Sequence, residues 1–207
     1  MSSTAGGRQS SENANQEETM GSIVVSQFVT LDGVVEDPGG SEKFERGGWA
    51  FQYERGEEGD KFKLDELMAS DALLLGRITY EGFAAAWPSR EGDFADKFNT
   101  MPKYVVSTTL ESPDWNNSTV IEGDVPARVA EVREQYDGDV LVNGSVQLVH
   151  ELLARSLVDE LRLMVFPVVL GAGKRLFGGT ESALPMQLVE SRQVGPDGVA
   201  ILIYRPA

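Results

Sequence analysis

The stretch from Asp139 to Phe177 restricts the fold more than any other part of this sequence. It opens with a short apolar run that ends at Val142, and the polar tripeptide at 143–145 interrupts that run. Apolar residues then recur at helical spacing, and a second apolar run covers 161–170; the helical positions are Val146, Val149, Leu152, Leu153 and Leu157. This order predicts a strand, a helix and a second strand, and hence a right-handed crossover onto a parallel sheet.

The turn after the first strand of this unit predicts an anion site. The first N–H groups of a helix have no partner inside the helix, and here they point past the end of the preceding strand. Together with the helix dipole they favour phosphate. The turn Asn143-Gly144-Ser145 is therefore the first candidate for binding a phosphate-bearing ligand.

Two other apolar runs end in turns that carry hydrogen-bond donors. The run Ala72–Leu75 leads into Gly76-Arg77-Ile78-Thr79 and a helix that stops at Pro88, and the run Lys103–Leu110 carries hydroxyls at its end. In an open α/β sheet the carboxyl ends of the strands share one edge, where nucleotides bind. We also expect strands at 22–30 and 119–121, helices at 60–69 and 125–136, and a closing antiparallel hairpin of 186–193 and 199–204.

Composition narrows the class of protein. A chain of 207 residues with 41% hydrophobic residues can fill one α/β domain, which we place at 21–207, after a disordered tail at 1–20. The net charge of −15 argues against nucleic acid as a partner, and no apolar run approaches the ~20 residues of a membrane span. The absence of cysteine excludes disulfides and thiolate catalysis and suits a reducing cytoplasm, and a single histidine excludes a His-rich metal site.

Three segments, in this order, resemble the dihydrofolate reductase family: GRITYEGF at 76–83, VNGSVQLVHELL at 142–153 and FPVVLGAGKRLF at 166–177. They are most similar to the branch that resembles the C-terminal reductase domain of bacterial riboflavin biosynthesis enzymes, over roughly 21–205. The resemblance implies an α/β, three-layer fold whose mostly parallel central sheet is closed by a C-terminal antiparallel hairpin. It also implies NADPH as the cofactor and a homodimer.

The resemblance assigns the cofactor to the three donor-rich turns. Its phosphates would lie at Gly76, Arg77 and Thr79, and its pyrophosphate at Asn143, Gly144, Ser145 and Val146. Ser107 and Thr108 fall where the family binds the adenosine 2′-phosphate of NADPH. Hydroxyls are neutral donors to such a group, whereas an acidic residue there would favour NADH, and none follows until Glu111.

Two aspartates are the catalytic candidates. Asp32 ends the first strand in a Leu31-Asp32-Gly33 turn, where it could contact substrate or cofactor ribose, or simply bond its own backbone. Counted back from GRIT, Asp60 falls where dihydrofolate reductases carry the acid that binds the pterin. The alternative for Asp60 is a surface residue on an acidic helix.

Substrate contacts are predicted at Phe28, Trp49, Tyr80 and Lys174. Trp49 lies in the loop 36–59, whose spaced aromatics could cover a planar ring, form a small cluster beneath the loop, or meet a second subunit. Lys174 follows glycines that fail as a phosphate loop, because the glycine and the hydroxyl that such a loop needs are missing. Its ammonium could instead contact a substrate anion.

These expectations favour an NADPH-dependent reductase that moves hydride to a small pterin- or pyrimidine-like heterocycle. Folate itself is disfavoured, because Met101 and Met164 stand where dihydrofolate reductases carry an arginine and a threonine that hold it. The alternative is a nucleotide-binding or ligand-sensing protein that uses the same fold without turnover. His150, in mid-helix, is interpreted as structural.

Overall fold

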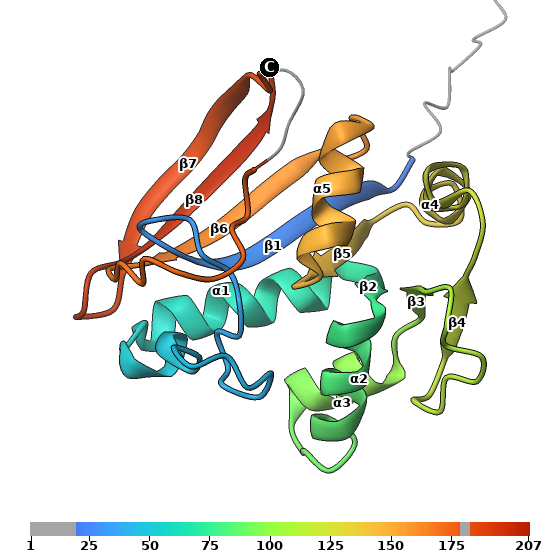
Figure 1. Cartoon of the computed structure of the whole chain (residues 1–207), viewed down its shortest axis with the longest axis horizontal. Coiled ribbons are helices and arrows are strands. Elements are labelled where there is room, and N and C mark those ends of the chain that lie inside the picture. The colour runs from blue at the N-terminus through green and yellow to red at the C-terminus, as the bar shows by residue number, and fades with distance from the viewer. Residues whose placement is uncertain (1–19, 179–182) are drawn as a thin grey trace, which may run out of the picture.

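The computed structural model describes residues 20–178 and 183–207, and the predicted tail at 1–20 lies outside this range except for Met20. Eight strands form one sheet in the order β4-β3-β2-β5-β1-β6-β8-β7 (Figure 1). The strands are β1 Ser22–Thr30, β2 Ser70–Gly76, β3 Lys103–Val106, β4 Ser118–Ile121, β5 Asp139–Asn143, β6 Glu160–Phe166, β7 Met186–Val194 and β8 Val199–Pro206.

The first six strands pair in parallel, whereas β8 pairs antiparallel with both β6 and β7. The unit that begins at Asp139 forms as predicted, because β5 leads through α5 to β6 and both strands pair in parallel with β1. A mostly parallel sheet closed by a C-terminal hairpin confirms the predicted fold class.

The helices cover both faces of the sheet and make three layers (Figure 1). They are η1 (a 3-10 turn) Trp49–Gln52, α1 Gly56–Ala69, α2 Arg77–Ala86, α3 Asp93–Thr100, α4 Val125–Arg133 and α5 Val146–Ala154. Alternate strand residues face opposite sides, so Val140 packs with α4 and α5 while Leu141 packs with α1, α2 and α3. Among the described residues, no helix has the length and apolar character to cross a membrane.

Helix α1 begins at Gly56 instead of 60 and α4 ends at Arg133 instead of 136, and three further departures from the sequence pattern have a clear reason. Helix α3 was not predicted, since its eight residues include only three apolar ones, Phe94, Ala95 and Phe98. The strand predicted to reach Leu110 ends at Val106, because Ser107 Oγ accepts the N–H groups of two following residues and turns the chain. Strand β6 ends at residue 166 instead of 170, where a proline that cannot donate a hydrogen bond follows.

Candidate functional site

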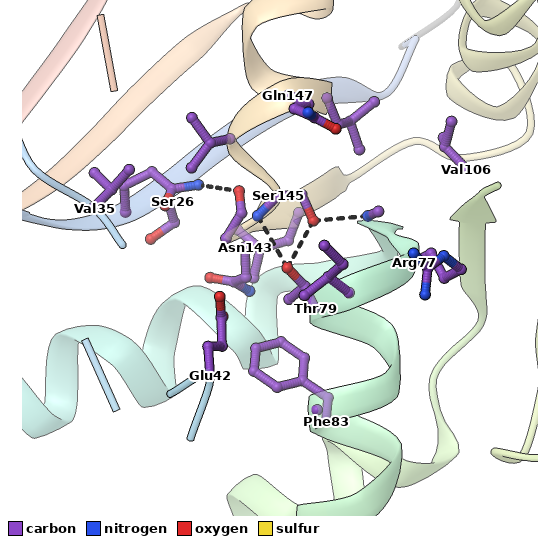
Figure 2. Close-up of a pocket in the computed structure, with 18 of the residues that line it drawn as sticks. Ser26, Val35, Glu42, Arg77, Thr79, Phe83, Val106, Asn143, Ser145 and Gln147 are labelled. Carbon is purple, nitrogen blue, oxygen red and sulfur yellow. Dashed lines mark hydrogen bonds between the residues drawn. The ribbon is translucent and has the colours of Figure 1, made fainter. Parts of the chain in front are cut away.

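A cavity of about 810 Å³ opens at the carboxyl ends of the central strands. The strand register places the ends of neighbouring strands at the same level beside this cavity. Val106 at the end of β3 pairs with Gly76 and with Ile121, and Ser26 of β1 pairs with Asn143. The turns that follow β4, β3, β2 and β5 therefore meet side by side, as expected for a nucleotide-binding edge of an α/β sheet. Their residues Arg77, Thr79, Asn143 and Ser145 are drawn in Figure 2.

Hydrogen bonds lock two of these turns together. The backbone N–H and the hydroxyl of Ser145 each lie 3.0 Å from Thr79 Oγ1, and Ser145 Oγ accepts the N–H of Gly76 at 2.7 Å (Figure 2). Ser145 has a φ of 57°, a left-handed conformation that is costly for serine. The bonds to Thr79 and Gly76 stabilise this conformation, which lets helix α5 begin at Val146 with its first N–H groups along the cavity wall.

Gly144 has no room for a side chain. Its φ is +61°, and a Cβ atom there would lie 2.9 Å from Thr79 Oγ1. The carbonyl of Gly144 accepts a 2.7 Å hydrogen bond from Gln27 Nε2, which fixes the turn from the β1 side. A glycine with this φ, beside a helix start, lets a ligand phosphate approach the backbone closely.

The end of the cavity at β3 and β4 carries charges of both signs. The Arg77 guanidinium lies 2.8 and 3.0 Å from the two carboxylate oxygens of Glu81, in an exposed pair. Ser107 is buried, and its oxygen already accepts two backbone N–H groups, so its hydroxyl proton is what a ligand could use. Glu122, directly after β4, lines the same end.

Acidic and basic side chains also line the mouth of the cavity. Lys174 Nζ lies 2.8 Å from Glu36 Oε1, and this contact raises the pKa of Lys174 and lowers that of Glu36. Burial, together with the charge of Asp37, raises the pKa of Glu42, whose side chain faces the Asn143 side of the cavity in Figure 2.

Two charged residues of α1 reach the floor of the cavity, and sequence reasoning missed both. Lys63 Nζ donates to Ser26 Oγ at 2.7 Å and to Glu66 Oε1, and the Glu66 side chain is only 1% exposed. The signal for Glu66 was its position directly before Leu67, which is 1% exposed and packs in the core. A carboxylate at the core-facing side of a helix is rare unless it is paired.

Most predicted ligand contacts line this one cavity. All nine predicted cofactor residues do so, as do two of the four predicted substrate residues; these eleven are Gly76, Arg77, Thr79, Ser107, Thr108, Asn143, Gly144, Ser145, Val146, Phe28 and Lys174. The structure thus brings together turns that are far apart in the sequence, from Gly76 to Val146.

The structure places both catalytic candidates outside the cavity lining, which corrects those assignments. The Asp32 carboxylate accepts hydrogen bonds from Thr30 Oγ1 at 2.7 Å and from the N–H groups of Gly171 and Leu170. These bonds, the one from Thr30 first, lower its pKa to about 2 against the opposing effect of burial. Asp32 therefore holds the loop after β6 in place. This role is close to the alternative interpretation, in which the aspartate only forms hydrogen bonds with the backbone of its own turn.

Asp60 is likewise a surface residue, as its alternative interpretation held. Its side chain is 66% exposed and pairs with Arg55 Nε at 2.6 Å, beside a shallower depression that does not include the cofactor turns. Counting residues back from GRIT had predicted that Asp60 binds the substrate. The helix instead presents a later residue, Glu66, to the cavity.

Trp49 and Tyr80 are core residues, so the prediction that they contact substrate is corrected as well. Trp49 is 1% exposed, donates from Nε1 to the carbonyl of Glu36 and packs edge-on against Phe166. Tyr80 is 2% exposed, and its hydroxyl accepts the N–H of Trp115. The buried aromatics of the loop 36–59 are thus a small cluster beneath the loop, although Phe51 is exposed and lines the cavity rim.

Comparison with known proteins gives a family and a fold. The family model described as RibD C-terminal domain matches residues 22–200. The Bacillus subtilis (strain 168) protein YyaP is 27% identical over 187 residues, which cover 88% of this chain and 93% of YyaP.

Solved structures share the fold at lower identity. A Shewanella sp. PV-4 protein assigned to riboflavin biosynthesis has a TM-score of 0.72 at 21% identity, over 90% of this chain and 99% of that one. Dihydrofolate reductase from Enterococcus faecalis, complexed with NADP(H), has a TM-score of 0.57 at 13% identity, over 89% of this chain and 96% of that one.

Proposed function

The chain belongs to the RibD C-terminal domain family, and on that premise we propose that it is an NADPH-dependent reductase of a small pterin- or pyrimidine-like heterocycle. The observation that carries the proposal is the convergence of three donor-rich turns, at Gly76, Ser107 and Asn143, on one cavity. The E. faecalis dihydrofolate reductase, which shares the fold, was complexed with NADP(H).

The residues present fit a dinucleotide. The backbone N–H groups at the start of α5, beside Gly144, would hold its pyrophosphate, because they have no partner inside the helix. Arg77 would hold a phosphate at the β3 end, where its fork of N–H donors suits a bidentate contact. The bound nicotinamide would supply the hydride, while the protein orients the two reactants and excludes water.

The choice between NADPH and NADH depends on opposing charges. Arg77 favours a 2′-phosphate, but it already contacts Glu81, and the nearby Glu122 repels a phosphate. Ser107 and Thr108 add neutral donors at the same end. NADH therefore has to be compared in parallel with NADPH.

The test is a titration of the purified protein with NADPH and, separately, NADH, followed by fluorescence or calorimetry. The double variant Gly144→Asp, Ser107→Glu places negative charge at two predicted phosphate contacts and should abolish binding. Because Gly144 has no room for a side chain, the loss counts only if the variant still unfolds cooperatively in a thermal melt. The matched control, Gly178→Asp, Ser112→Glu, makes the same changes at exposed positions. Tight NADPH binding that only the cavity variant loses supports the proposal, whereas no binding of either nucleotide at low or high salt refutes it.

A specific observation favours a second candidate function, a nucleotide-binding or ligand-sensing protein without turnover. Neither predicted catalytic aspartate lines the cavity, and both form bonds or ion pairs elsewhere. The two functions differ in NADPH oxidation with a panel of pterins and pyrimidines. Turnover of any of them establishes a reductase, and tight binding of nucleotide with no turnover across the panel favours the sensor.

We propose in addition that the chain forms a homodimer in the cytoplasm. Strand β7 is an edge of the sheet and exposes Leu188 and Val189, which are 48% and 50% accessible. An exposed apolar edge strand is a common surface for self-association. Light scattering after size-exclusion chromatography tests this, with Val189→Lys expected to shift the mass to that of a monomer.

A further inference from the structure

Glu122 is an acidic residue at the end of the cavity that β3 and β4 form. It follows β4 directly, is exposed, and lines the cavity together with Ser107. Its carboxylate forms no hydrogen bond and no ion pair with any residue that the structure describes. Both carboxylate oxygens can therefore accept hydrogen bonds from a ligand.

The pairing of the strands places Glu122 beside Ser107. Ile121 of β4 lies opposite Val106 of β3, and the N–H of Ser107 donates to the carbonyl of Ile121 at 3.2 Å. Glu122 and Ser107 are thus the next residues along two neighbouring parallel strands. A Cβ atom on the following residue, Gly123, would meet nothing within 4 Å, so a ligand has room to approach the backbone here.

These two side chains offer one donor and one acceptor to the same ligand group. Ser107 Oγ already accepts the N–H groups of Thr109 and Leu110, at 3.1 and 2.9 Å, so its hydroxyl is left as a donor. The ionised Glu122 carboxylate can only accept. A ligand hydroxyl can accept from the first and donate to the second, whereas a phosphate would meet Glu122 as a like charge.

The positive charge at this end of the cavity already has a partner. The Arg77 guanidinium lies 2.8 and 3.0 Å from the two carboxylate oxygens of Glu81. One cation and two anions, with Glu122 as the second anion, leave this end with a net negative charge. A 2′-phosphate carries about two negative charges and is repelled by such a site, whereas a neutral ribose is not.

The start of α4, directly after Gly123, does not supply the missing donors. Asp124 Oδ1 accepts the N–H of Ala127 at 3.2 Å, and the N–H of Arg128 donates to the Asp124 carbonyl at 3.0 Å. Pro126 in the first turn has no N–H. A helix start binds phosphate through several free N–H groups, and this one offers few.

We propose that Glu122 is a specificity-determining residue that accepts a hydrogen bond from the 2′-hydroxyl of the adenosine ribose, so that the site binds NADH as well as NADPH. Ser107 donates to the same hydroxyl. In other α/β nucleotide sites, an acidic residue that bonds this hydroxyl favours NAD over NADP. The inference rests on the proposed function, because it places a dinucleotide in this cavity with its adenosine at the β3 end.

The test compares the dissociation constants of NADH and NADPH, measured by calorimetry, for the wild type and Glu122→Ala. The variant should bind NADH about tenfold more weakly, because it lacks one hydrogen bond to a charged group. It should bind NADPH about fivefold more tightly, because a like charge beside the 2′-phosphate is gone. Glu134→Ala, at the exposed end of α4, is the matched control and should leave both constants unchanged.

A second probe isolates the hydroxyl itself. The 2′-deoxyadenosine analogue of NADH lacks only the group that Glu122 and Ser107 are proposed to bind. It should bind the wild type at least about tenfold more weakly than NADH. In Glu122→Ala this difference should fall to about threefold, since only the bond from Ser107 remains to be lost.

Several results would overturn the inference while the proposed function stands. These are an unchanged ratio of the NADH and NADPH constants in Glu122→Ala, the same change of that ratio in Glu134→Ala, and equal binding of NADH and its deoxy analogue by the wild type. A wild type that binds NADPH but not NADH also contradicts it. Binding of neither nucleotide refutes the proposed function, and the inference with it.

Discussion

The hydrogen bonds between Thr79 and Ser145 allow a quantitative prediction. Thr79→Val keeps the shape of the side chain and removes Oγ1, which is the partner of both the N–H and the hydroxyl of Ser145 at 3.0 Å. Each lost bond should lower the free energy of unfolding by about 1 kcal/mol, and both together by about 2 kcal/mol. In a chain of 207 residues this corresponds to a fall in melting temperature of roughly 4–8 °C.

The same bonds should couple stability to nucleotide binding. Without Thr79 Oγ1, the left-handed conformation of Ser145 loses two of the contacts that hold it, and the start of α5 becomes less ordered. We therefore expect weaker NADPH affinity in Thr79→Val. Thermal unfolding and NADPH titration measure the two effects, and Thr119→Val on the exposed side of β4 is the matched control.

A double-mutant cycle tests the reasoning most directly. Ser145→Ala removes the hydroxyl bond to Thr79 and the bond from the Gly76 N–H. Because the hydroxyl bond is lost in either single variant, the double variant should be more stable than the sum predicts by about 1 kcal/mol. The reasoning would be refuted if the changes in unfolding free energy added to within about 0.3 kcal/mol. It would also be refuted if Thr79→Val had the melting temperature of the wild type.

Two further predictions concern charged residues that hold the fold. The pKa of Asp32 is lowered from its ordinary 3.8 to about 2, so its stabilising effect is complete above pH 4 and is lost as the pH falls toward 2. Asp32→Asn should therefore flatten this part of the curve of unfolding free energy against pH. Parallel curves for the variant and the wild type would contradict this. The buried Lys103 ammonium donates to the carbonyls of Asn99, Met101 and Asn116 at 3.0, 2.8 and 3.0 Å. Lys103→Met should lower the free energy of unfolding in urea by about 3 kcal/mol, whereas the exposed Lys61→Met should not, and equal midpoints for the two would be incompatible with this role.

The order of the elements and the positions of the turns follow from the sequence alone. Apolar runs of strand length and a helix with regular apolar spacing are local signals, so the unit from Asp139 was predictable. The turns at Gly76, Ser107 and Asn143 were predictable for the same reason, because the carboxyl ends of parallel strands share an edge. All nine predicted cofactor residues therefore line the cavity.

Which side chains line the cavity could be read only from the folded chain. Asp32 and Asp60 are carboxylates at suitable sequence positions, but one is held by backbone N–H groups of a loop 138 residues away and the other faces solvent. Glu66 lies six residues beyond Asp60 on the same helix, beside Leu67, whose side chain packs in the core, and it lines the cavity. Helix rotation and loop contacts depend on packing between distant segments, and no local pattern in the sequence records them.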